Sequence, residues 1–148
     1  MASNYDFLLE RYKFILAQKQ TLNRNTFVAI SIYQASFALI VYAQFTVLTR
    51  FYEGSVSAHL AATGSALLLG FLFILSFFLI ALIAGGIASW LNYRSDEADI
   101  EREMFGRSRR PATLSDAFKW YESYVLLAIL FLFVTYCFVY FILIRSVF

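Results

Sequence analysis

The sequence predicts an all-α integral membrane protein with three transmembrane helices and long cytoplasmic helical extensions, in a single membrane domain over residues 1–148. Hydrophobic residues make up 61% of the chain and charged residues 15%. A soluble domain typically has about 45–50% hydrophobic and about 25% charged residues. This chain therefore has too few polar residues to cover the surface of a water-soluble domain. Three uncharged stretches are also long enough to cross a bilayer, which takes roughly 20 residues. In lipid each must be a helix, because every backbone amide needs an internal partner.

The first expected element is an amphipathic cytoplasmic helix over residues 4–26. One face of it carries the apolar residues at helical spacing, namely Tyr5, Leu8, Tyr12, Ile15 and Leu22. No Gly or Pro occurs before Glu53, so this helix can continue into the first span, residues 27–49. The alternative is a helix that lies flat on the inner leaflet and kinks near Asn23–Asn25.

The second span covers residues 60–91. These residues would form a helix of about 48 Å, whereas the hydrocarbon core is about 30 Å thick, so the helix tilts or projects from it. A break into two short spans at Gly70 is the alternative, but no charge or Pro marks a turn there. Helix-forming residues continue over Tyr93–Phe105, and Gly106 is suited to end the helix.

The third span covers residues 123–144 and follows a cytoplasmic helical connector, residues 92–122. Within the connector, Pro111 marks a turn. Thr113 followed by Asp116 is the pattern of a helix start, so we expect the third helix to begin there. The span itself is bulky and nearly free of small residues, which favours a lipid-facing position.

The distribution of Lys and Arg sets the threading. Ten of the 12 lie before the first span or in the connector, and only Arg50 and Arg145 lie on the other side. The positive-inside rule therefore places the N-terminus and the connector in the cytoplasm and the C-terminus outside, in the cell (inner) membrane. Aromatic residues suited to the inner interface are Trp90, Tyr93, Trp120, Tyr121 and Tyr124.

Small and polar residues form one stripe on each of the first two spans, and such stripes normally face protein. The first holds Ser31, Gln34, Ala35, Ala38, Tyr42 and Thr46; the second holds Ala62, Ala66, Gly70, Ala81, Ala84, Gly85 and Ala88. We therefore predict a homo-oligomer; the alternative is a monomer, in which packing inside the chain covers the stripes, or a hetero-complex. The expected interface residues are Ser31, Gln34, Ala38, Ala66, Gly70, Ala81 and Gly85.

Three further groups of residues carry functional hypotheses. Phe73 and Phe77 project from the second stripe near mid-membrane, where their rings would gate a pore by dewetting; ordinary packing is the alternative. The basic residues of the connector turn suit an anionic lipid or ligand: Arg107, Arg109 and Arg110. The acidic residues of the connector are expected to form a solvated face paired with nearby arginines: Asp96, Glu97, Asp99, Glu101 and Glu103. Gln34 and Gln44 are each explained by hydrogen bonds between helices.

Several classes of activity are excluded by what the chain lacks. His59 and Cys137 are its single histidine and cysteine, and no Asp, Glu, Lys or Arg lies inside a span. No HExxH, GxSxG, P-loop or GxGxxG motif occurs. We therefore expect no enzyme activity, no catalytic residue, no cofactor and no metal site. A net charge of +2 makes direct nucleic-acid binding an unfavoured function.

These features favour an oligomeric effector or sensor that couples a cytoplasmic partner or signal to membrane perturbation, with a pore as one form of it. The alternative is a non-conducting scaffold that holds a soluble partner at the inner leaflet. The layout of residues 4–105, including YDFLLERYKFILAQKQTLNRN and YRSDEADIEREMF, resembles the small membrane effectors of bacterial anti-phage systems. The third span has no counterpart in their two-span layout. The resemblance implies a partner protein encoded alongside, and growth arrest or depolarisation on activation.

Overall fold

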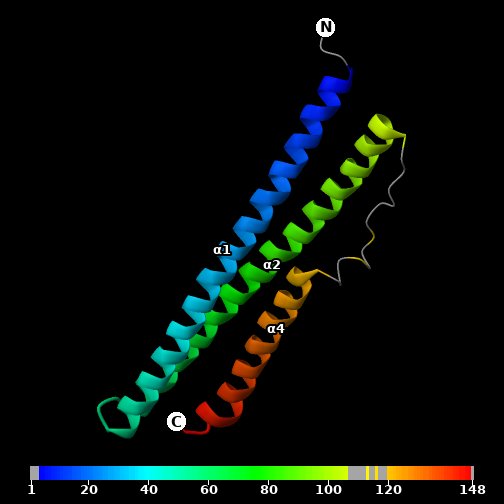
Figure 1. Cartoon of the computed structure of the whole chain (residues 1–148). Helices are drawn as coiled ribbons and strands as arrows, with labels where there is room; N and C mark the ends of the chain where they lie inside the picture. The colour runs from blue at the N-terminus through cyan, green and yellow to red at the C-terminus, as the bar shows by residue number, and fades with distance from the viewer. Residues whose placement is uncertain (1–3, 107–112, 114–115, 117–119, 148) are drawn as a thin grey trace. The chain divides into compact units, whose positions relative to one another are not determined.

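The computed structural model describes residues 4–106, 113, 116 and 120–147. Its regular elements are α1 (Asn4–Tyr52), α2 (Ala58–Phe105), α4 (Tyr121–Val139) and a π-helical turn η1 (Tyr140–Ile144) (Figure 1). No strand occurs among these residues. Helices α1 and α2, and α4 together with η1, are each long and apolar enough to cross a membrane. The predicted all-helical class with three candidate spans is confirmed.

Helix α1 is a single helix of 49 residues, drawn in Figure 1 as an unbroken ribbon. It continues through Asn23–Asn25 without leaving the helical conformation, so the predicted continuous helix is confirmed. The chain turns directly after Tyr52, where Gly54 adopts a φ of 75°. Only glycine adopts this left-handed conformation without strain, which fixes where the helix ends.

Helix α2 also runs without a break, through Gly70 and on to Phe105. The prediction of one long helix rather than two short spans is therefore confirmed. Gly106 ends it with a φ of 65°, and its N–H donates to the carbonyl of Arg102 at 3.0 Å. This is the expected glycine cap, in which the left-handed residue satisfies a carbonyl left open at the helix end.

The sequence predicts one helix that runs from Thr113 into the third span. In the structure Asp116 is helical, but a bend at Trp120 separates it from the helix of the span. The N–H and hydroxyl of Thr113 donate to the carboxylate of Asp116 at 3.0 and 2.9 Å, so part of the expected cap forms. However, Trp120 lies in a bend, and α4 begins at Tyr121. At its other end, the N–H of Arg145 donates to the carbonyl of Tyr140 at 2.8 Å, five residues back, which is the π-helical spacing.

The chain forms two compact units. Unit 1 comprises Met1–Val28 and Leu82–Tyr124, and unit 2 comprises Ala29–Ala81 and Val125–Phe148. In unit 1, Leu8 and Ile15 of α1 pack against Ile100 of α2, with Tyr12, Tyr93 and Met104 around them. The buried residues of unit 2 come from all three helices and η1: Tyr33, Ile40, Gln44, Ala61, Ser65, Leu72, Ser76, Leu79, Ile129, Tyr136, Tyr140 and Ile144.

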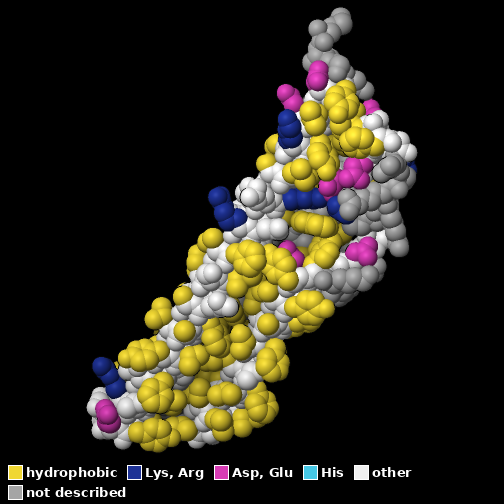
Figure 2. Space-filling model, in the orientation of Figure 1, with side chains coloured by type: hydrophobic (Ala, Val, Ile, Leu, Met, Phe, Trp, Pro, Cys, Tyr) yellow, Lys and Arg dark blue, Asp and Glu magenta, His cyan; other side chains and the backbone are white. Residues whose placement is uncertain are grey.

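Most of the apolar surface of the spans faces outward. In the most apolar window of each candidate span only 17%, 22% and 22% of the residues are buried. Figure 2 shows hydrophobic side chains over much of the surface of unit 2 on the face it draws. Exposed rings and branched chains of this kind, such as Leu67, Phe78 and Phe131, are what lipid tails would cover.

Candidate functional site

A buried polar network joins the three helices of unit 2. The side-chain amide of Gln44 on α1 donates to the hydroxyl of Ser65 on α2 at 2.8 Å. The phenol of Tyr136 on α4 donates to the carbonyl oxygen of the same amide at 3.4 Å. Between α1 and α2, the hydroxyls of Tyr33 and Ser76 lie 3.0 Å apart. The expectation that Gln44 bonds between helices is confirmed.

This network gives the spans a defined pairing inside an apolar environment. Each such bond is worth about 0.6 kcal/mol on average between membrane helices, so its main effect is to fix the register of the helices. Ring contacts add to it: Phe37 meets Tyr136 edge-on at 6.3 Å between centroids, and Phe73 meets Phe133 at 5.8 Å. Helix α4 is therefore held by a hydrogen bond as well as by apolar contacts. The bulky apolar sequence of α4 did not predict the hydrogen bond.

The residues of the predicted oligomer interface are left open by packing inside the chain. Exposed in the structure are Ser31, Gln34, Ala38, Ala66, Gly70, Ala81 and Gly85. A Cβ atom added at Gly70 or at Gly85 would meet nothing within 4 Å. On α1 the stripe lies on the side away from the buried residues Tyr33 and Gln44. These seven residues are thus exposed in the single chain, whereas Thr46 and Ala62, at the ends of the two stripes, are half-buried.

The two phenylalanines proposed as a gate differ in their surroundings. Phe73 is 55% exposed, and one side of its ring contacts Phe133 of α4. Phe77 is 67% exposed. The anionic-lipid residues Arg107, Arg109 and Arg110 lie outside the described residues.

Unit 1 holds a buried charge cluster that joins α1 to α2. Lys19 Nζ of α1 lies 2.5 Å from Glu97 Oε2 of α2, and Arg94 Nη1 lies 2.6 Å from the same oxygen. Only 6% of the Glu97 side chain is exposed. The expectation of a solvated acidic face is therefore wrong for Glu97, because the helix pair covers it. Asp96 fits that expectation: its carboxylate lies 3.6 Å from Arg11 Nη2, and both side chains are about half exposed.

The ionisation of Glu97 follows from this arrangement. It lies six residues beyond the predicted end of the second span, outside the segment expected in lipid. Burial alone would raise the pKa of Glu97, but the hydrogen bonds and charges of Lys19 and Arg94 outweigh burial and hold the pKa below its ordinary value of 4.5. Glu97 is therefore ionised at neutral pH and serves as an anchor for both cations.

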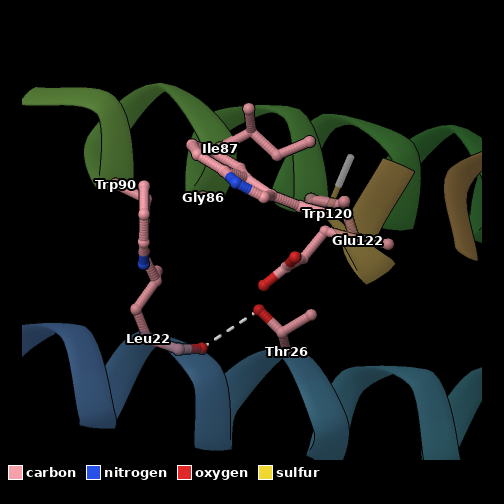
Figure 3. Close-up of a pocket in the computed structure, with 8 residues that line it drawn as sticks. Leu22, Thr26, Gly86, Ile87, Trp90, Trp120 and Glu122 are labelled. Atoms are coloured by element: carbon pink, nitrogen blue, oxygen red, sulfur yellow. Dashed lines mark hydrogen bonds between the residues drawn. The ribbon is translucent and has the colours of Figure 1, made fainter. Parts of the chain in front are cut away.

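A small recess lies next to this cluster, where Leu22 and Thr26 of α1 face Gly86, Ile87 and Trp90 of α2 (Figure 3). Trp120 and Glu122, at the start of α4, complete its lining, together with Ile83. The rings of Trp90 and Trp120 meet edge-on with centroids 4.0 Å apart. The predicted inner-interface tryptophans thus contact one another.

Polar groups point into this recess from two sides. Thr26 is 4% exposed, and its hydroxyl donates to the carbonyl of Leu22 at 3.0 Å. In Figure 3 the carboxylate of Glu122 points towards that hydroxyl. Near Trp90, Lys19 Nζ lies 5.1 Å and Arg94 Cζ 5.9 Å from the ring centroid. The recess therefore combines a carboxylate, a hydroxyl oxygen and two indole rings.

The comparisons with known proteins add no identity. No family model, no curated protein and no solved structure matches the chain. Its function is therefore argued from its own residues.

Sequence reasoning had missed Lys19, Thr26 and Glu122 as parts of one site, although one signal was present. Lys19 and Thr26 fall on the same face of α1 as Leu8, Ile15 and Leu22, within about 60° of one another. A lysine on an apolar face needs a buried acidic partner. That partner, Glu97, is 78 residues away, and the sequence pattern alone does not set which acidic residue of α2 lies opposite.

Proposed function

We propose that the chain is a homo-oligomeric inner-membrane effector or sensor, in which the cytoplasmic helices receive a partner or signal and the spans perturb the membrane. One observation carries the proposal: the seven predicted interface residues on α1 and α2 stay exposed after packing among the described residues. Small residues let the backbones of membrane helices approach closely. The helices of a second copy would pack closely against both stripes, whereas lipid tails gain nothing from small residues.

Gln34 supports this assembly. It is exposed within the first predicted span, and its amide makes no hydrogen bond among the described residues. An amide left unpaired in hydrocarbon is costly, whereas a facing copy can supply both a donor and an acceptor. Gln44, by contrast, is already paired with Ser65 and Tyr136. In this proposal Gln44 joins helices within one chain, and Gln34 joins one copy of the chain to another.

The test is the number of subunits in detergent and in lipid nanodiscs. Gly70→Leu and Gly85→Leu should each shift the oligomer towards monomer, because a leucine would hold two backbones apart. Neither change should disturb the single chain, since nothing lies within 4 Å of the added Cβ atom. Gly64→Leu is the matched control for Gly70→Leu: an added Cβ atom there also meets nothing within 4 Å, and Gly64 lies about 120° from Gly70 around the helix. Unchanged subunit number in both stripe variants would contradict the proposal.

The effector activity itself is tested by ion flux through liposomes that contain the purified chain, with and without a candidate cytoplasmic partner. The anti-phage setting rests on the resemblance in layout of residues 4–105. The scaffold alternative is favoured by one observation in unit 1: Phe7 and Phe14, seven residues apart on α1, are 61% and 59% exposed outside the predicted span. A chain that binds a soluble partner through this face and never conducts would be a scaffold.

A further inference from the structure

The recess between Thr26 and Glu122 has room for one small group. About 10 Å³ is open to the centre of a water-sized group. A single water molecule needs about 10–15 Å³ by this measure. One water molecule, or the head of a primary ammonium, therefore fits. A trimethylammonium group, with three methyls around its nitrogen, does not fit unless the tryptophan rings move apart.

Whatever occupies the recess must donate hydrogen bonds. The Thr26 hydroxyl gives its proton to the Leu22 carbonyl, so only the lone pairs of its oxygen remain for an occupant. An ionised carboxylate such as that of Glu122 only accepts hydrogen bonds. The carboxylate of Glu122 already takes part in a hydrogen bond with the Tyr121 side chain, and its other lone pairs remain for a donor placed beside Thr26. A water molecule brings two donors and a primary ammonium brings three.

Charge decides between these two occupants. The faces of indole rings attract cations, and Trp90 and Trp120 both line the recess. The neighbouring cations Lys19 and Arg94 are bonded to Glu97, and Glu122 makes no ion pair with any basic residue that the structure describes. A water molecule would satisfy the acceptors but brings no charge. An ammonium satisfies them and also brings the charge opposite to that of Glu122.

The position of the recess in the chain indicates where such a group comes from. Trp90 lies at the end of the second predicted span, and Glu122 lies one residue before the third. Both are therefore expected at headgroup depth, where tryptophan is enriched. We propose that the recess formed by Thr26, Trp90, Trp120 and Glu122 binds a primary ammonium group, supplied by an aminophospholipid headgroup or by a soluble amine. The site is independent of the proposed oligomer.

The chain carries a built-in reporter for this site. Trp90 and Trp120 are its only two tryptophans, so selectively excited tryptophan fluorescence observes the recess alone. The full-length chain is placed in nanodiscs of phosphatidylcholine, into which phosphatidylethanolamine is titrated. We expect a saturable change in emission. Free ethanolamine in phosphatidylcholine nanodiscs is the second arm. A response to the lipid only assigns the ammonium to a headgroup, and a response to both assigns the site to amines in general.

Two variants test the contacts. Glu122→Gln keeps the shape and removes the charge, and it should weaken binding by about tenfold or more, as expected for a charged hydrogen bond. Thr26→Val removes the hydroxyl at similar volume and should weaken binding by several-fold. Glu10→Gln, which changes an exposed carboxylate elsewhere on α1, is the control and should bind like the unchanged chain. Circular dichroism reports whether each variant keeps its helices.

Three results would overturn the proposal. One is the absence of any emission change with either amine, which would leave a recess that holds water alone. Another is an equal response when phosphatidylglycerol, which has no amine, replaces phosphatidylethanolamine. The third is unchanged binding in both Glu122→Gln and Thr26→Val.

Discussion

At the scale of the residue, Glu97 is a buried acidic residue between the two helices of unit 1. A carboxylate on a side chain that is 6% exposed is stable as an ion only because two cations meet it. Removing one partner of a buried ion pair leaves a charge without compensation and is strongly destabilising, whereas removing an exposed pair costs little. The Lys19–Glu97–Arg94 cluster should therefore control the pairing of α1 with α2 in unit 1, and the Arg11–Asp96 bridge should not.

Glu97→Gln should destabilise unit 1 by about 2 kcal/mol at neutral pH, because a neutral amide replaces a carboxylate that anchors two cations. The measurement is amide hydrogen exchange over residues 93–105, which reports local opening of the helix pair. Asp96→Asn, one residue away in a half-exposed bridge, is the control and should change exchange by less than about 1 kcal/mol. Equal effects of the two substitutions would show that burial of Glu97 has no energetic consequence.

The same carboxylate predicts a pH dependence. The folded pKa of Glu97 is depressed, so its contribution to stability is complete above the unfolded value near 4.5 and is lost as the pH falls through the folded pKa. The protection of residues 93–105 in the unchanged chain should therefore decline below about pH 4.5 towards that of Glu97→Gln. A difference between the two chains that persists well into more acidic solution would contradict the assignment.

Residue by residue, the sequence predicts what depends on local pattern and misses what depends on register. Gly106 could be predicted as a helix end because a glycine after a long run of helix-forming residues readily adopts the left-handed conformation of a helix cap. The contacts of Lys19 with Glu97, and of Trp90 with Trp120, join residues far apart in the chain. A shift of one residue in the pairing of α1 and α2 would bring other side chains together, and no periodicity in either helix fixes that shift.

At the scale of the element, the length of uncharged sequence was sufficient to predict three helices long and apolar enough to cross a membrane. Absence of Pro and of charge predicts continuity because nothing else stops a helix in lipid. The start of α4 and the π-helical turn η1 were not predictable in this way. The bend at Trp120 accompanies its contact with Trp90, which is a tertiary event, and the sequence YFILI of η1 reads as ordinary helix.

Helix α2 carries the prediction that concerns conduction. Phe77 is 67% exposed on the side of the small-residue stripe, whereas Phe73 also contacts Phe133 of α4. If the oligomer encloses a hydrophobic gate, Phe77→Ala should increase the leak of ions from liposomes, because a smaller side chain lets water wet the constriction. Phe131→Ala, an exposed ring on α4, is the control. Equal, unchanged leak in both variants would assign Phe77 to packing or to lipid contact.

At the scale of the whole molecule, the distribution of charge and the exposed apolar surface argue for the same arrangement. Ten cationic residues flank the spans on one side and two on the other. The described members of the larger group lie on the parts of α1 and α2 that extend beyond the predicted spans. Insertion with these residues on the cytoplasmic side avoids moving them across the bilayer, which is the physical basis of the positive-inside rule.

This threading predicts which positions react with a membrane-impermeant thiol reagent in intact cells. In a background where Cys137, the single cysteine, is replaced by Ala, Ser55→Cys in the turn after α1 and Ser146→Cys near the C-terminus should be labelled from outside. Ser95→Cys on the extension of α2 should be labelled only after the membrane is opened. All three serines are exposed in the structure, so burial does not account for a difference. Labelling of Ser95→Cys in intact cells, with protection of Ser55→Cys, would show that the chain has the opposite orientation in the membrane. The tryptophan recess would then lie at the outer leaflet, where a cytoplasmic partner could not reach unit 1, and the effector proposal would fail with it.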